Sequence, residues 1–194
     1  MSDFMFFDYE TYSECDIKFG TFRYAQDDST DIVSLAYSFD EINFHHWKPG
    51  QELPQDFIAH IKEGKPVRAW NVGFEYAITN YVGAKLYGFP KIKIEQVFCT
   101  MSDALALALP ASLEACGEAL ELDILKDKRG KDLIRKLSKP RKPTKDKPYT
   151  RATPENEPEL FQEFYEYNIQ DVKAEVAIFK TLPRLIKGKE LDLF

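Results

Sequence analysis

Two carboxylates lie one residue apart near the N-terminus, at the end of a short apolar run. Residues 5–7 are Met-Phe-Phe, and Asp8 and Glu10 follow with Tyr9 between them. The run has the length and aromatic content of a buried strand, whose side chains alternate between the two faces of a sheet. Asp8 and Glu10 are therefore expected on one face, where they repel each other unless a cation lies between them. Carboxylates at this spacing suit a hard ion such as Mg²⁺, although for this tripeptide alone two solvated acids at a strand end are the simpler interpretation.

Two further acidic clusters follow later in the chain. Glu75 falls in the first turn of a predicted helix that Asn71 is placed to cap. Capping and the helix dipole are a sufficient structural reason for both residues. Tyr167 and Asp171 are four residues apart in a predicted long helix, so they lie on one face, one turn from each other. An Asp in mid-helix is usually a surface residue, but this one has apolar neighbours on both sides in the sequence.

The composition is that of an ordinary globular protein. The 194 residues are 44% apolar and 30% charged, which predicts one domain with a sizeable core and excludes wholesale disorder. Three cysteines without a CxxC pair argue for a reducing compartment and against a structural zinc site. We find no signal peptide and no apolar run long enough to cross a bilayer, so we expect a soluble, cytoplasmic protein without a membrane partner.

The net charge of −6 is unevenly distributed. Residues 126–151 hold 12 Lys and Arg against three Asp, whereas the rest of the chain holds 14 Lys and Arg against 29 acidic residues. An acidic body with one basic segment fits a protein that concentrates metal in one place and nucleic-acid phosphates in another. A solvated, flexible loop fits equally well. The candidate phosphate contacts in this segment are Lys139, Arg141 and Lys142.

Strand and helix patterns alternate along the chain. We expect strands over residues 5–11, 21–24, 32–39, 42–47 and 67–70, with 94–99 ambiguous. We expect helices over residues 54–62, 71–86, 103–109, 113–120, 131–137 and 157–179. This order predicts an α/β domain with a mixed sheet that includes an antiparallel meander. Prolines, charge and a lack of apolar residues make 138–156 the expected mobile part.

The three acidic clusters together resemble the three motifs of the DEDD 3′→5′ exonucleases, which have a ribonuclease H-like fold. A strand-end Asp-x-Glu, a helix-start Glu and a late-helix Tyr-x-x-x-Asp occur in the order of that family. Tyr167 precedes Asp171 by four residues and Glu166, rather than His, precedes it by five, which resembles the tyrosine subclass. Blocks such as WNVGFEYAI, GKDLIRKLSKPRKPT and FYEYNIQDVKAEVAIFKTLP are similar to the proofreading domain of phage-type family A DNA polymerases.

The resemblance implies a metal-dependent 3′→5′ DNA exonuclease that releases nucleoside monophosphates by phosphodiester hydrolysis. Its cofactors would be two divalent ions, Mg²⁺ or Mn²⁺, about 4 Å apart. By this resemblance Asp8 bridges the two ions, Glu10 and Asp171 complete the first site, and Glu75 holds the second ion through water. Tyr167 orients the attacking water. The family more commonly carries Asp in place of Glu75, whose extra methylene moves the carboxylate outward.

The residues next to these motifs are candidates for contacts with the terminal nucleotides. Thr11 and Asn71 are placed to contact the last nucleotide. Tyr12 and Phe74 could stack on frayed bases, as aromatic side chains do in single-strand binding sites. The alternative for both aromatics is ordinary core packing, which the sequence favours more for Phe74 than for Tyr12.

The expected exonuclease domain covers residues 1–186, and residues 187–194 form a tail or linker. In the fused polymerases the chain continues into a polymerase domain, for which these 194 residues leave no room. The last five residues either begin such a link or resemble the short peptide with which bacterial replication proteins bind the sliding clamp. In the second case Leu191, Leu193 and Phe194 make the contacts.

The expected partners are single-stranded or frayed 3′ DNA ends, together with a DNA polymerase and a sliding clamp, in a bacterial or phage-infected cell. Two alternatives stay open. One is an RNA 3′→5′ exonuclease of the same fold. The other is a catalytically inactive module that holds DNA ends.

Overall fold

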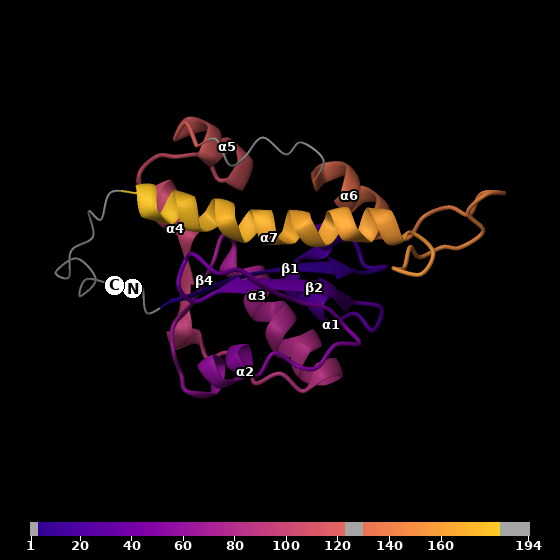
Figure 1. Cartoon of the computed structure of the whole chain (residues 1–194), viewed down its shortest axis with the longest axis horizontal. Coiled ribbons are helices and arrows are strands. Elements are labelled where there is room, and N and C mark those ends of the chain that lie inside the picture. The colour runs from indigo at the N-terminus through magenta and orange to yellow at the C-terminus, as the bar shows by residue number, and fades with distance from the viewer. Residues whose placement is uncertain (1–3, 123–129, 183–194) are drawn as a thin grey trace.

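The structure is a computed structural model and describes residues 4–122 and 130–182. Its elements are labelled in Figure 1. The strands are β1 (Met5–Tyr12), β2 (Asp31–Ser38), β3 (His45–Trp47), β4 (Val67–Ala69) and β5 (Val97–Cys99). The α-helices are α1 (Thr21–Gln26), α2 (Gln55–Lys62), α3 (Val72–Ala77), α4 (Thr100–Ala106), α5 (Leu113–Ala119), α6 (Gly130–Leu137) and α7 (Pro158–Thr181). The 3₁₀ segments η1 (Ile17–Phe19) and η3 (Ile94–Gln96) and the π-helical η2 (Ile78–Tyr87) complete the order.

The strands of the described chain form one mixed sheet in the order β3-β2-β1-β4-β5. β1 pairs antiparallel with β2, which pairs antiparallel with β3, so the predicted meander is present. On its other side β1 pairs parallel with β4, and β4 pairs parallel with β5. The predicted α/β domain with a mixed sheet is therefore confirmed, and the arrangement is consistent with a ribonuclease H-like fold.

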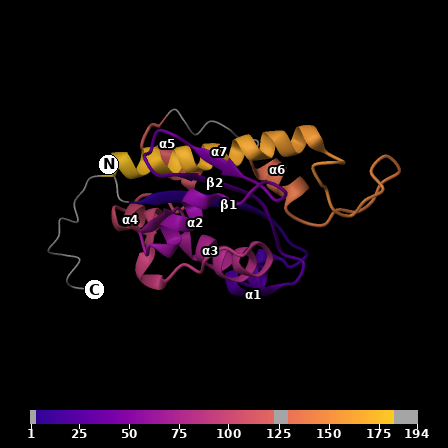
Figure 2. The same ribbon diagram turned by 60° about the horizontal axis from the view of Figure 1, so that its bottom comes forward.

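Helices cover both faces of this sheet. α7 runs along one face with α5 and α6 beside it, whereas α1, α2 and α3 lie on the other (Figures 1 and 2). β1 contributes to both layers because its side chains alternate. Phe6 shares an apolar cluster with Val176 of α7, and Phe7 packs against Phe57 of α2. Asp8 follows Phe6 on the α7 face, as the alternation predicts.

Residues 21–24 are helical, so the predicted strand there is wrong. α1 begins after Gly20, whose φ of 104° turns the chain sharply out of η1. Within α1 only Tyr24 and Ala25 are buried, which is the one-sided pattern of a surface helix. The four residues of the predicted strand are too few to show a helical or a strand period, so their aromatic content alone misled the prediction.

The strand predicted over residues 42–47 is confirmed only in its second half, as β3. The first half forms a turn in which the Asp40 carboxylate accepts hydrogen bonds from the backbone N–H groups of Ile42 (3.0 Å) and Asn43 (2.7 Å). Glu41, the residue before the predicted strand, has a φ of 63°, a left-handed conformation typical of a turn.

The helix expected over residues 71–86 is present in two forms, because α3 continues directly into the π-helical η2. Gly83 of η2 lies so close to Phe89 that a Cβ there would be 2.8 Å from the Phe89 Cδ2. Gly88, with a φ of 72°, ends the segment in the left-handed conformation that is common at helix C-termini. Asn71 stands at the N-cap position of α3, but its side chain makes no capping hydrogen bond, so the predicted cap is not formed.

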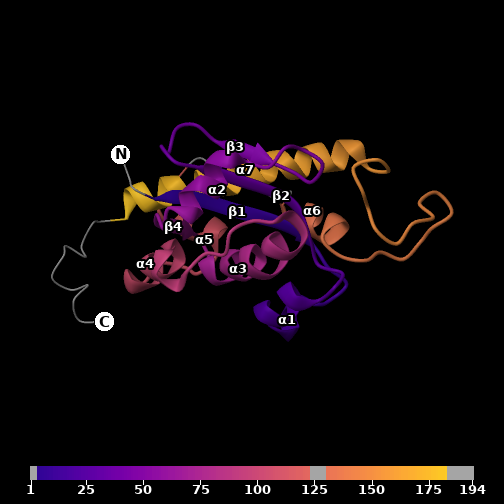
Figure 3. The ribbon, with the colours of Figure 1, turned by 90° about the horizontal axis from the view of Figure 1, so that it is seen from below.

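A hairpin-like loop leads from α6 to α7 and extends away from the rest of the fold (Figures 1 and 3). The Arg141 N–H donates to the Thr150 carbonyl (2.8 Å), and the Thr144 N–H donates to the Lys147 carbonyl (2.9 Å). The expected absence of helix and strand over 138–156 is confirmed, whereas the expected mobility of this loop stays a prediction. In residues 4–122 and 130–182 no helix is both long and apolar enough to cross a membrane.

Candidate active site

Three carboxylates gather where β1 faces α7. β1 presents Asp8 and Glu10, and Asp171 comes from the helix that covers the same face of the sheet. One oxygen from each of these carboxylates lies within 4.8 Å of the other two. The fold thus joins two clusters that are more than 160 residues apart in the sequence.

Glu75 approaches this trio from the first turn of α3. Its side chain is buried, and its Oε2 has no hydrogen-bond partner among the described residues. Burial raises the pKa of Glu75 well above its usual range, and the nearby charge of Asp8 raises it further. A buried carboxylate oxygen without a donor is costly, and a cation would remove that cost.

Burial also raises the pKa values of Asp8 and Glu10, and the neighbouring carboxylates add to the effect. A hydrogen bond from Asn168 of α7 lowers the pKa of Asp8. The Asn168 Nδ2 donates to the Asp8 Oδ2 at 2.6 Å, which stabilises the ionised carboxylate. The Ser34 hydroxyl donates to the Asn168 Oδ1 at 2.9 Å and so orients the amide. Sequence reasoning did not identify Asn168, although it adjoins the Tyr-x-x-x-Asp pattern.

Glu175 is a further buried carboxylate that sequence reasoning missed. It follows Asp171 by one turn of α7, and the Thr100 hydroxyl donates to its Oε1 at 2.5 Å. Burial raises the pKa of Glu175 to about 8, although the Thr100 hydrogen bond and the charge of Arg68 act to lower it. The available signal was the spacing, because residues four apart share one face of a helix.

Tyr167 lies one turn before Asp171 and hydrogen-bonds to it. Burial, followed by the charges of Asp171 and Glu10, raises the pKa of this phenol, which therefore stays protonated. Gly130, the first residue of α6, packs directly on the ring. A Cβ at Gly130 would lie 2.6 Å from the Tyr167 hydroxyl oxygen and closer still to ring carbons. Only glycine allows α6 to approach the tyrosine so closely.

The carboxylates form the floor of a cleft of about 780 Å³. Its walls come from the segment after β1 on one side and from the end of α6 on the other. Three of the candidate nucleic-acid contacts line this cleft: Thr11, Phe74 and Lys139. The Thr11 hydroxyl lies 2.8 Å from the hydroxyl of Tyr24, and the half-buried Phe74 packs beside the same tyrosine.

Two other candidates lie outside the cleft. Tyr12 is buried among residues of α6 and α7, including Leu133 and Phe164, and Arg151 covers its ring with the guanidinium carbon 4.3 Å from the centroid. This placement corrects the expectation that Tyr12 stacks on bases, and it reverses the expected order of Tyr12 and Phe74. Tyr12 is buried because it follows Asp8 and Glu10 on the face that α7 covers. Asn71 is exposed at the start of α3 and does not line the cleft.

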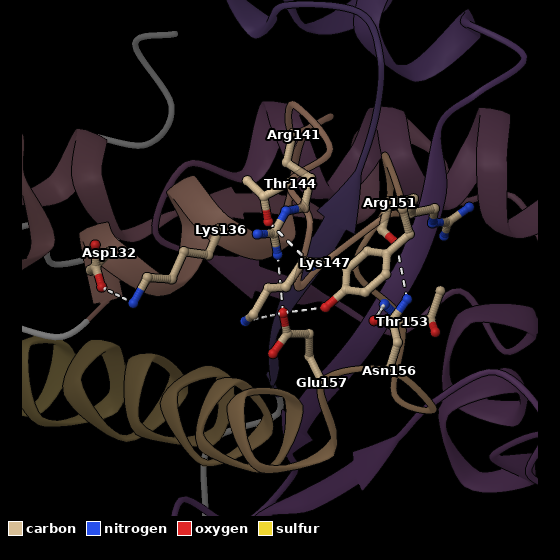
Figure 4. Close-up of polar contacts among 10 residues, drawn as sticks. Asp132, Lys136, Arg141, Thr144, Lys147, Arg151, Thr153, Asn156 and Glu157 are labelled. Atoms are coloured by element: carbon tan, nitrogen blue, oxygen red, sulfur yellow. Dashed lines mark hydrogen bonds and ion pairs between the residues drawn. The ribbon is translucent and has the colours of Figure 1, made fainter.

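Arg141 and Lys142 lie in the hairpin-like loop. The Glu157 carboxylate connects several residues of that loop, because it accepts hydrogen bonds from Lys147, from the Tyr149 hydroxyl and from Arg141 (3.0 Å). Figure 4 shows the two cationic partners, Lys147 and Arg141. These partners, Lys147 first, hold the pKa of Glu157 below its usual range. Arg141 is therefore engaged within the loop, whereas Lys142 is exposed.

The remaining predictions concern the C-terminal end. The candidate clamp contacts Leu191, Leu193 and Phe194, and the expected domain boundary after residue 186, lie outside the described residues. Both stay predictions.

Comparison with known proteins gives one informative similarity. No family model matches the chain. A DNA polymerase of Bacillus phage SP02 is 35% identical to it over 176 residues, which is 88% of this chain and 26% of the polymerase. The chain is related to a phage DNA polymerase. It spans about a quarter of the length of that relative.

The donor set of the cleft fits a hard divalent cation. Within the described residues, the candidate ligand group consists of carboxylates alone, without His or Cys. Mg²⁺ and Mn²⁺ prefer such oxygen ligands, whereas Zn²⁺ sites usually include nitrogen or sulfur. The unsatisfied Oε2 of Glu75 provides a further oxygen beside the group. The residues present therefore suit the predicted ions.

Proposed function

We propose that this chain is a metal-dependent 3′→5′ DNA exonuclease of the proofreading type, in the tyrosine subclass of the DEDD family. The observation that carries the proposal is the meeting of Asp8, Glu10 and Asp171 at the floor of a cleft. The relationship to a phage DNA polymerase supports a role in DNA metabolism. The reaction is hydrolysis of the last phosphodiester of a strand, which releases a nucleoside monophosphate and leaves a strand shortened by one nucleotide.

The carboxylates would hold two divalent ions, Mg²⁺ or Mn²⁺. Asp8, Glu10 and Asp171 would hold one, and Asp8 with Glu75 would hold the other. When bound, such ions acidify water and stabilise the attacking and leaving oxygens of an in-line displacement. Asn168 favours cation binding, since its amide stabilises the ionised form of Asp8.

Tyr167 would orient the attacking water through its hydroxyl. Because the pKa of the phenol is raised, the group acts as a hydrogen-bond donor and acceptor rather than as a base. Thr11 and Phe74 line the cleft beside the carboxylates and would contact the sugar and base of the terminal nucleotide. Lys139, also on the cleft wall, would contact a phosphate.

The test is digestion of a 3′-labelled DNA primer in Mg²⁺ or Mn²⁺, with EDTA and an RNA primer of the same sequence as comparisons. We expect metal-dependent release of labelled mononucleotide from DNA by the wild type and no release by Asp8→Ala. Glu159→Ala, which removes an exposed carboxylate of α7, is the matched control and should retain activity. Binding of DNA ends without cleavage would refute the proposed exonuclease activity and support a module that only binds DNA ends. Faster digestion of the RNA primer than of the DNA primer would identify RNA as the substrate.

A DNA polymerase and a sliding clamp are the proposed partners. The clamp proposal rests on the similarity of the last five residues to clamp-binding peptides, with Leu191, Leu193 and Phe194 as the contacts. Deletion of residues 190–194 should abolish binding to a bacterial clamp without changing hydrolysis of the free primer. Equal clamp binding by the full and shortened chains would refute the proposal.

A further inference from the structure

Glu175 is a buried carboxylate that the proposed reaction does not use. It is 2% exposed, and the Thr100 hydroxyl donates to its Oε1 at 2.5 Å. It is not part of the described group of carboxylates that lie within reach of one ion. Burying an acid for packing alone is unfavourable, because an apolar side chain of similar volume packs at lower cost. The hydrogen bond of Glu175 is therefore expected to fix a geometry.

Asp171 lies between two polar anchors of α7. On its N-terminal side, Asn168 donates to the Asp8 Oδ2 at 2.6 Å, which ties the helix to β1. On its C-terminal side, Glu175 ties the helix to Thr100, the first residue of α4. Hydrogen bonds are directional, whereas the apolar contacts of α7 with the sheet are not. The two anchors together therefore fix the rotation and the position of the turn that carries Asp171.

Thr100 belongs to a part of the fold that is bonded to the start of α3. The N–H of Met101, the next residue of α4, donates to the Trp70 carbonyl at 3.0 Å. Trp70 follows β4 directly and stands two residues before α3, whose first turn carries Glu75. The hydrogen bond between Thr100 and Glu175 thus connects α7 to the segment from which α3 begins.

Further contacts hold the place where Glu175 meets Thr100. Arg68 of β4 is buried and forms an ion pair with Asp103 of α4, and its guanidinium carbon lies 4.6 Å from the ring centroid of Phe179. Phe179 follows Glu175 by one turn of α7, so both side chains lie on one face of that helix. β4, α4 and α7 therefore meet at one point, and a shift of Thr100 relative to β4 would break these contacts.

We propose that Glu175 is a positioning residue, which through Thr100 sets the distance between Asp171 and Glu75. In the proposed function Asp171 helps to hold one divalent ion and Glu75 helps to hold the other, so this distance sets the spacing of the two ions. Glu175 itself contacts neither the ions nor DNA. The inference rests on the proposed function, because it concerns the ions that those carboxylates would hold.

The first measurement is the binding of Mn²⁺ by the whole chain without DNA, followed by the electron paramagnetic resonance signal of free Mn²⁺. Thr100→Val removes the hydroxyl donor at nearly constant volume. It should weaken binding of the more weakly held ion by roughly 10–100-fold, the usual effect of losing a residue that orients a metal ligand. Thr100→Ser keeps the hydroxyl and should bind like the wild type. Glu175→Gln keeps an oxygen for that hydroxyl and should also bind like the wild type.

Ile178→Val is the control for a loss of stability, since Ile178 is buried in an apolar cluster that it shares with Ala104 of α4. It shortens a side chain where the same two helices meet without removing a hydrogen bond, so its Mn²⁺ binding should match the wild type. Equal weakening in Ile178→Val and Thr100→Val would overturn the inference, because the effect would then be one of stability. Weaker binding in Glu175→Gln without weaker binding in Thr100→Val would also overturn it and identify Glu175 as a metal ligand.

The second measurement separates this inference from the proposed function. In the primer assay, Thr100→Val should need about tenfold more Mg²⁺ for half of its maximal rate, while its KM for DNA at saturating Mg²⁺ stays that of the wild type. Primer hydrolysis together with unchanged Mn²⁺ binding in Thr100→Val would overturn the inference and leave the exonuclease intact. Mn²⁺ binding that depends on the Thr100 hydroxyl, without hydrolysis of any primer, would support the inference and refute the exonuclease. A wild type that binds no Mn²⁺ would overturn both.

Discussion

The burial of Glu175 predicts how the stability of the cation-free protein depends on pH. In the folded protein its pKa is raised from 4.5 to about 8, chiefly by burial. The unfolded chain therefore loses this proton at lower pH than the folded chain does. Stability from the protonated carboxyl is complete below about pH 4.5 and is lost progressively as the pH rises to about 8.

The size of the effect follows from the shift. In this range the free energy of unfolding falls by about 1.4 kcal/mol per pH unit for one proton. Glu175 alone should thus cost about 3 kcal/mol between pH 5.5 and pH 7.5. Asp8, Glu10 and Glu75 also have raised pKa values, so the wild type should lose more than this amount.

The assay is urea unfolding in EDTA at pH 5.5 and pH 7.5, followed by circular dichroism. Glu175→Gln keeps an oxygen for the Thr100 hydroxyl and cannot titrate, so its loss of stability over this range should be about 3 kcal/mol smaller than that of the wild type. Glu159→Gln, an exposed carboxylate of the same helix, should behave like the wild type. An equal loss in Glu175→Gln and the wild type, or a wild type that gains stability with pH, would refute the reasoning.

Three further predictions concern the cleft. Gly130→Ala should displace the Tyr167 ring and lower kcat in the primer assay about as much as Tyr167→Phe does. Gly73→Ala is the control and should keep the wild-type kcat, because there is open space around the new methyl group. Equal kcat values in the two alanine variants would contradict the role of this packing. Asn168→Leu removes the donor to Asp8, a hydrogen bond worth about 2 kcal/mol, and should move the rising limb of the pH–rate profile up by at least about one unit. Excess Mg²⁺ should raise the free energy of unfolding of the wild type at pH 7.5 by about 2–3 kcal/mol, and calorimetry should find almost no gain in Asp8→Asn.

Much of the fold could be predicted because long elements carry their own period. β1 opens with a continuous apolar, aromatic run and α7 extends over 24 residues, so the type of each element was evident in the sequence. α1 has only six residues, and the sequence predicted a strand there. Its helical form accompanies the burial of two side chains in the folded protein, which local propensity does not report. The π-helical form of η2 depends on the packing of Gly83 against Phe89, which no local pattern reports.

For the candidate site, the residues that carry charge were easier to predict than the residues that support them. Asp8, Glu10 and Asp171 stand in a recognisable order, and the structure brings them within reach of one another. Asn168 and Glu175 act through tertiary contacts to β1, β2 and α4, so their importance appears only once α7 is docked.

The cluster of Asp8 and Glu10 with Asp171 has a consequence for the timing of synthesis. The two β1 acids leave the ribosome first, whereas Asp171 comes more than 160 residues later, which at roughly 5–20 residues per second is on the order of ten seconds or more. Until α7 emerges and docks on the sheet, the growing chain carries Asp8 and Glu10 without Asp171, so the cluster is incomplete. Premature termination anywhere before α7 would thus yield fragments that lack the complete cluster. The order of translation would therefore delay completion of the carboxylate cluster until α7 has been made.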